Sequence, residues 1–131
     1  MVKVEEPVVV EEEESTKPES YLVKKGDTIA AHYTGFVLDS GAYFDTSREA
    51  DAKKHGLYNE ARDYTPLKTI IGEEAVIDGW EEGFQLLRKG AKATLYIPSI
   101  HAYGPRKRSE EILPNSVLVF EVDLIDIIRK E

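Results

Sequence analysis

Apolar and polar residues alternate along residues 28–37, which is typical of a β-strand with one buried face. The apolar or small residues at alternate positions are Ile29, Ala31, Tyr33, Gly35 and Val37. A turn signal at residues 26–27 precedes this run, and a second at residues 39–41 follows it. We therefore expect a hairpin whose second strand begins near residue 42.

Three further apolar runs, at residues 67–71, 91–97 and 117–128, also predict strands. Between the first two, apolar residues recur at spacings of three and four, which indicates a helix over residues 74–89. These residues are Val76, Ile77, Trp80, Phe84 and Leu87. Acidic residues come early in this segment, basic residues come late, and Gly90 supplies a stop. One helix among five or six antiparallel strands predicts an α+β fold with the helix on one face of the sheet.

The first 20 residues differ in texture from the rest of the chain. They hold seven glutamates and two lysines, a charge density that resists packing. We expect an acidic, flexible tail over residues 1–20, with a short edge strand at 7–10 as the open alternative. The domain proper then spans residues 21–131.

Composition excludes several classes of function. The chain has 131 residues and a net charge of −8, so it lacks the basic face that nucleic-acid binding requires. It has no cysteine, and His32, His55 and His101 are too far apart in sequence for a helical metal pair. It contains no apolar run long enough to span a membrane, no signal peptide and no phosphate-binding glycine loop. We expect no metal and no cofactor.

A series of short motifs, in order along the chain, resembles the FKBP family, the FK506-binding peptidyl-prolyl cis-trans isomerases. The matching stretches are residues 26–27, 32–35, 44–48, 71–72, 76–83, 90–93, 97–99, 102–104, 112–116 and 118–124. The resemblance implies a curled antiparallel sheet of five or six strands wrapped around one short helix. It also implies an apolar cavity between helix and sheet that binds a prolyl peptide.

Carried over position by position, the resemblance assigns two catalytic and eight substrate-binding residues. Asp45 would be the polar group at the wall, and Tyr103 would donate its hydroxyl to a substrate carbonyl. Trp80 would form the floor under the proline ring, and the Ile77 N–H would be a second donor. The remaining pocket residues would be Tyr33, Phe44, Leu67, Val76, Ile112 and Phe120.

Simpler explanations exist for most of these residues. Trp80, Tyr33 and Phe120 lie at positions where core packing alone would place an aromatic residue, and Asp45 fits a turn or a helix cap. Tyr103 lies in a loop that contains glycine and proline, so packing explains it least. It is the strongest single candidate for a functional side chain.

The chemistry of prolyl isomerisation agrees with the absence of a nucleophile or metal motif. No bond is made or cleaved; rotation about the amide must only overcome a resonance barrier of about 18–20 kcal/mol. The twisted amide has lost charge separation, so a water-poor aromatic pocket favours it over the planar ground state.

The sequence departs from the family pattern in three places. An insertion at about 50–64 separates Asp45 from Leu67, and it is interpreted either as a binding element or as a solvated decoration. Leu67 stands where an aromatic residue is common, which should loosen the grip on a flat ring. Charged residues in the loop at 105–112, Glu111 among them, predict a polar pocket rim.

The sequence thus predicts a monomeric prolyl isomerase that assists protein folding. Its expected partners are proline-containing peptides or unfolded clients and macrolides of the FK506 class, with no nucleic acid and no membrane span. A non-catalytic module that binds proline peptides or a partner, and a purely structural domain, are the alternatives on the same fold. A cytoplasmic location is favoured, and the cell envelope stays open if a signal or anchor has been removed.

Overall fold

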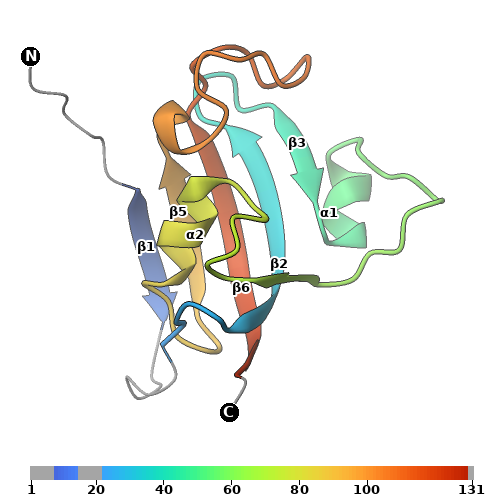
Figure 1. The fold of residues 1–131 in the computed structure, drawn as a ribbon. Coiled ribbons are helices and arrows are strands. Elements are labelled where there is room, and N and C mark those ends of the chain that lie inside the picture. Colours follow the sequence, from blue (N-terminus) through green and yellow to red (C-terminus); the bar gives the residue numbers. More distant parts are fainter. Residues whose placement is uncertain (1–7, 15–21, 130–131) are drawn as a thin grey trace, which may run out of the picture.

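The computed structural model describes residues 8–14 and 22–129, which build one six-stranded antiparallel sheet with a short helix packed on it (Figure 1). The strands are β1 (Val9–Glu14), β2 (Thr28–Val37), β3 (Tyr43–Thr46), β4 (Leu67–Ile70), β5 (Lys92–Ile97) and β6 (Leu118–Ile128). Their spatial order is β1-β5-β6-β2-β3, and β4 also pairs with β2. The predicted α+β class, with a curled sheet around a short helix, is confirmed.

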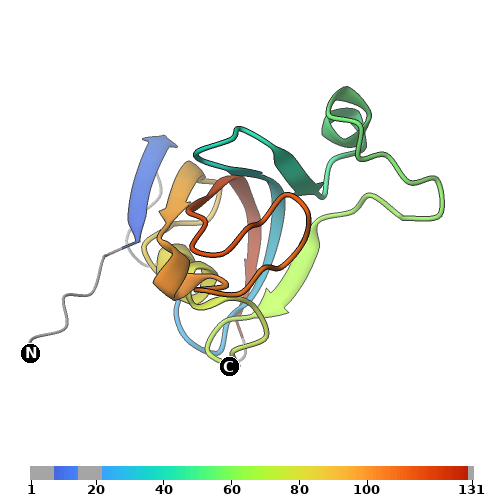
Figure 2. The ribbon, with the colours of Figure 1, turned by 90° about the horizontal axis from the view of Figure 1, so that it is seen from above.

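Strand β2 pairs with three other strands of the sheet. One edge of β2 pairs with β6 along its whole length. The other edge is shared, because residues 28–31 pair with β4 and residues 34–36 pair with β3. The chain between β3 and β4 therefore leaves the sheet and returns to the same edge of β2, and it projects from the body of the molecule there (Figure 2).

Helix α2 (Asp78–Phe84) lies on the concave face of the sheet and is shorter than the predicted 74–89. Glu74 has a positive φ of 55°, and Ile77 has the extended ψ of 151°, so the helix cannot begin before Asp78. After Phe84 the chain turns away, and the Val23 N–H donates to the Leu87 carbonyl at 3.0 Å. The apolar periodicity over 74–89 thus records which residues are buried. Their backbone is extended before α2, helical within it and turned after it, rather than one long helix.

Two glycines let α2 approach strand β5 closely. A Cβ atom at Gly79 would lie 2.4 Å from Cγ2 of Ile97, and one at Gly83 would lie 3.2 Å from Cδ1 of Leu95. Ile97 and Leu95 are fully buried under the helix. The helix backbone itself therefore packs on the sheet, which draws Trp80 into the core.

Strand β1 forms the edge of the sheet beside β5. It runs through residues 9–14, with Val9 opposite Tyr96 and Glu14 opposite Lys92. The strand therefore extends from the valines through the acidic run, because backbone pairing does not depend on side-chain polarity. The other parts of the expected tail, residues 1–7 and 15–20, lie outside the described residues.

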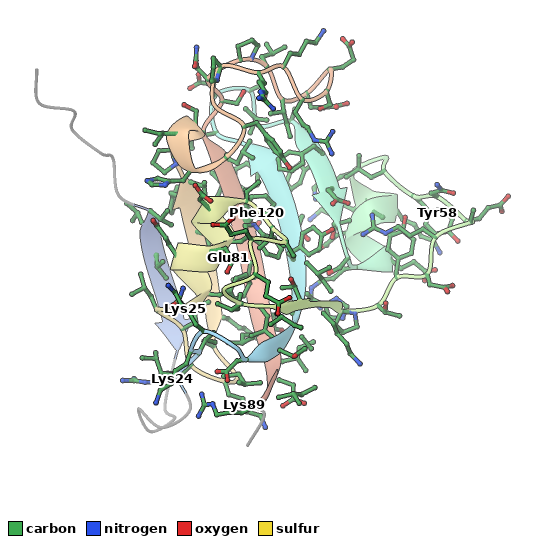
Figure 3. The ribbon with its side chains drawn as sticks, viewed as in Figure 1. Lys24, Lys25, Tyr58, Glu81, Lys89 and Phe120 are labelled. Carbon is green, nitrogen blue, oxygen red and sulfur yellow. The ribbon has the colours of Figure 1, made fainter. Side chains whose placement is uncertain are left out.

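The segment between β3 and β4, where the insertion at about 50–64 is expected, contains a short helix, α1 (Glu49–Lys54), and projects from the body of the molecule (Figures 1 and 2). Ala52 is fully buried against β3, and the His55 ring stacks on Tyr43 with centroids 3.5 Å apart. Tyr58, labelled in Figure 3, lies far from the sheet on this projection. Across the described ranges, no helix combines the length and apolar character needed to cross a membrane.

Candidate functional site

A pocket of about 700 Å³ opens between α2 and the sheet. All ten side chains that the sequence singled out line it: Tyr33, Phe44, Asp45, Leu67, Val76, Ile77, Trp80, Tyr103, Ile112 and Phe120. Four further residues complete the lining: Ala75, which the sequence did not single out, and Arg108, Ser109 and Glu111 of the loop expected at the rim. Residues up to 87 positions apart in the chain thus meet at one cavity.

An aromatic cluster forms the inner surface of this pocket. Trp80 is 4% exposed, and its ring meets Tyr33 and Phe120 edge-on, with centroids 5.1 Å away in both cases. Phe44 meets Phe120 in the same way at 5.6 Å. Figure 3 shows the Phe120 side chain on the side of the sheet that faces α2. Edge-to-face packing fixes these rings without filling the cavity, so a preformed apolar floor results.

Gly35 on β2 makes room for this cluster. A Cβ atom at this position would lie 2.7 Å from the rings of both Phe120 and Phe44. Any side chain here would push the two phenylalanines into the cavity. The absence of a side chain at this position of β2 therefore serves the pocket.

A hydrogen-bonded triad of Tyr33, Asp45 and Arg62 forms the polar wall. The Tyr33 hydroxyl donates to Asp45 Oδ2 at 2.6 Å, and Arg62 Nη1 donates to Asp45 Oδ1 at 2.7 Å. Arg62 Nη2 also donates to the Tyr33 hydroxyl oxygen at 3.3 Å. Burial, followed by the hydrogen bond to Asp45, raises the pKa of Tyr33 to about 12. Tyr33 therefore remains a protonated donor at neutral pH, and the Asp45 charge is compensated by Arg62.

Arg62 is the residue of this wall that sequence reasoning missed. It comes from the segment between β3 and β4, where its guanidinium lies 5.2 Å from the centre of the Tyr64 ring. Tyr64 in turn stacks on Tyr58, and its hydroxyl accepts the Asn59 N–H at 2.9 Å. The signal available in the sequence was the acidic Asp45 at an apolar site, which needs a cation partner. Nothing in the spacing of 17 residues identified which arginine supplies it.

Two hydrogen-bond donors at the pocket lack partners within the described residues. Tyr103 follows the 3₁₀ turn Ser99–His101, and its hydroxyl makes no hydrogen bond to described residues. Ile77 precedes α2 in extended conformation, and its N–H likewise donates to no described group. Both residues line the cavity, so these donors are available to a ligand.

The loop after Tyr103 forms the rim of the pocket. Its end is closed by a small turn, in which the Arg108 N–H donates to the Ile112 carbonyl at 2.9 Å and the Ile112 N–H donates to Ser109 Oγ at 3.1 Å. Ile112 is 4% exposed and anchors the loop. Arg108, Ser109 and Glu111 then give the cavity a polar rim, as the sequence indicated.

Comparison with known proteins identifies the family. A family model described as FKBP-type peptidyl-prolyl cis-trans isomerase matches residues 19–125. The chain belongs to this family. The predicted resemblance and the isomerase function it implied are therefore confirmed.

Individual relatives agree with this assignment. FK506-binding protein 1 of Rhizopus delemar is 42% identical over 104 residues, which cover 79% of this chain and 83% of that protein. Peptidyl-prolyl cis-trans isomerase Fkbp12 of Drosophila melanogaster is 38% identical over 104 residues, covering 79% and 83%. FK506-binding protein 2 of Kluyveromyces lactis is 38% identical over 106 residues, which cover 81% of this chain but 66% of that relative's length.

Proposed function

We propose that this FKBP-type domain catalyses the cis-trans isomerisation of Xaa-Pro bonds in the pocket above Trp80, and that it thereby assists the folding of proline-containing chains. The proline ring lies on the indole, inside the cluster of Tyr33, Phe44 and Phe120. The observation that carries the proposal is the coincidence of this buried aromatic floor with two unused donors, Tyr103 and Ile77, at one cavity.

The chemistry requires an environment that favours the twisted amide over the planar one. The planar amide has a resonance dipole, which water solvates and an aromatic pocket does not. The twisted amide has a weaker dipole, so moving the bond from water into the pocket costs the transition state less than the ground state. Each 1.36 kcal/mol of this difference gives a tenfold rate gain against the barrier of about 18–20 kcal/mol.

The polar groups then orient the peptide without stabilising its planar form. The Tyr103 hydroxyl and the Ile77 N–H each donate to a backbone carbonyl, which holds the chain on either side of the proline ring. Asp45 keeps Tyr33 in place at the wall, while Arg62 cancels its charge. The wall of Tyr33 and Asp45 is therefore fixed in position, and its compensated charge exerts little electrostatic force on the rotating amide.

Ligands of the same pocket would include segments of unfolded proteins and macrolides of the FK506 class. Two of the relatives are named FK506-binding proteins, which supports the macrolide part. Leu67 lines the pocket in place of a flat ring, so we expect looser macrolide binding than an aromatic residue there would give. We propose that the domain acts as a monomer, because this one chain supplies an aromatic floor, a polar wall and a rim to the pocket without a second copy.

The experiment compares isomerisation of a Xaa-Pro peptide by wild type, Tyr103→Phe and Tyr103→Ala in a protease-coupled assay. Loss of one hydrogen bond is worth about 0.5–1.5 kcal/mol, so Tyr103→Phe should lose at most about tenfold in kcat/KM. Tyr103→Ala should lose more, because it also opens the wall to water. Tyr96→Phe, a tyrosine on β5 outside the pocket lining, is the matched control and should keep full activity. Equal activity of wild type and a folded Tyr103→Ala would show that the bond turns elsewhere.

A further inference from the structure

The charged side chains at the pocket rim carry an inference about substrate choice, which rests on the proposed function. Three charged side chains line the cavity: Asp45, Arg108 and Glu111. The charge of Asp45 is compensated by Arg62 at 2.7 Å. Among the described residues, neither Arg108 nor Glu111 takes part in an ion pair. The electrostatic selection of a substrate therefore depends on these last two.

Arg108 is the one of the two that lies against a proposed substrate donor. Its guanidinium carbon is 5.4 Å from the centre of the Tyr103 ring. A guanidinium that stacks on a ring uses its face, so its N–H edge stays available to a carboxylate. The backbone N–H of Arg108 also donates to the carbonyl of the buried Ile112. This bond holds the backbone at Arg108 in place and so limits how far its side chain can move from the pocket.

One neighbouring charge of the loop favours the same sign of partner. Arg106 takes part in no ion pair with a described residue, whereas Lys107 lies 3.3 Å from Glu110, which compensates its charge. Glu111 opposes Arg108 in sign, but no contact places it on Tyr103 or on the Ile77 N–H. A peptide carbonyl held by Tyr103 thus comes with its adjacent side chains close to a cation.

We propose that Arg108 makes this isomerase prefer peptides with a carboxylate next to the proline. The preference arises from a charge-assisted contact between the guanidinium edge and a glutamate or aspartate that flanks the ring. At the separation of a partly exposed pair, this attraction corresponds to roughly threefold to tenfold in kcat/KM. Because the rim is open to solvent, the preference should shrink as ionic strength rises.

The test uses two peptide series, one varied before proline and one after it, with Glu, Gln or Lys at the varied position. Isomerisation is followed by NMR exchange, which requires no protease specificity. For wild type we expect a Glu/Gln ratio in kcat/KM of roughly three to ten in at least one series, with Lys below Gln. In Arg108→Gln the ratio should fall to about one. Each ratio is taken within one variant, so a general loss of activity cancels.

Two further variants make the test specific. Arg106→Gln removes a neighbouring charge that does not line the pocket and should keep most of the ratio, whereas Glu111→Gln should raise it. A wild type that is active on all peptides with a ratio of one in both series overturns this inference and leaves the proposed function standing. So does a ratio that survives in Arg108→Gln. A folded wild type that accelerates none of the peptides defeats the proposed function itself.

Discussion

The contact between α2 and β5 predicts that Gly79→Ala destabilises the protein although alanine favours helices. The new Cβ would lie 2.4 Å, 2.8 Å and 2.9 Å from three atoms of Ile97, whereas ordinary contacts of a Cβ start at about 3.4 Å. Ile97 is fully buried, so the ring of core residues around it cannot yield freely. The helix must move by about 1 Å, and it takes Trp80 with it.

The size of the effect follows from two opposing contributions. Overpacking of a tight core costs about 1–3 kcal/mol, and replacing glycine within a helix regains at most about 1 kcal/mol. We expect a net loss of about 1–2 kcal/mol, which lowers Tm by roughly 4–8 °C for a domain of this size. Urea unfolding and thermal melts measure both quantities. Because Trp80 shifts, kcat/KM should fall as well.

Gly83→Ala is the matched control on the same helix. Its Cβ would meet Leu95 at 3.2 Å, which requires a shift of only a few tenths of an ångström, so propensity and crowding nearly cancel and stability should change by less than about 1 kcal/mol. The double variant Gly79→Ala/Ile97→Ala should lose less free energy of unfolding than the sum of the losses of the two single variants, because the smaller side chain removes the clash. A Gly79→Ala protein as stable as wild type would refute this reasoning.

Two other variants test the polar contacts. Asp45→Ala should lower kcat/KM with less than about 1 kcal/mol lost in stability, because its ion pair with Arg62 is half-exposed; it should also lower the pKa of Tyr33, seen by ultraviolet titration. Unchanged activity would remove Asp45 from the site. Asp27→Ala should cost about 2–3 kcal/mol, since both carboxylate oxygens of this buried group accept from Arg129 at 2.9 Å. The Arg129 hydrogen bond holds the pKa of Asp27 below its ordinary 3.8, so this stability is present above that pH and is lost as the pH falls through the folded value. Acid unfolding of Asp27→Ala should accordingly be less steep, and equal pH slopes would contradict the assignment.

The sequence predicted most of the sheet because alternation of apolar residues depends only on which face of a strand is buried. Strands β2 and β5 start and end within one residue of the expected positions. The sequence overestimated the length of α2 because Val76 and Ile77 are apolar for a different reason. They line the pocket in an extended segment that precedes the helix. A hydrophobic pattern records burial but not the backbone conformation that achieves it.

The site could be assembled from the sequence only through family resemblance. Periodicity identifies Trp80 and Phe120 as buried, but it cannot say that a cavity remains between them. The contact of Arg62 with Asp45 was beyond reach because an insertion of unknown path separates them. Arg108 was seen as a charge in a loop, whereas its position over Tyr103 depends on how the turn at 108–112 closes.

The position of β6 has a consequence for how the protein is made. The last strand of the chain lies between β5 and β2, in the middle of the sheet, and Phe120 at the heart of the pocket belongs to it. A chain that is still attached to the ribosome and ends before residue 118 has two separate groups of strands, because β6 is absent and cannot pair with both β5 and β2. Its pocket also lacks Phe120. The isomerase must therefore fold after synthesis of this segment, slowly for its size, since nearly all its strand pairing joins distant residues. A truncation that removes β6 would abolish the whole domain rather than shorten it.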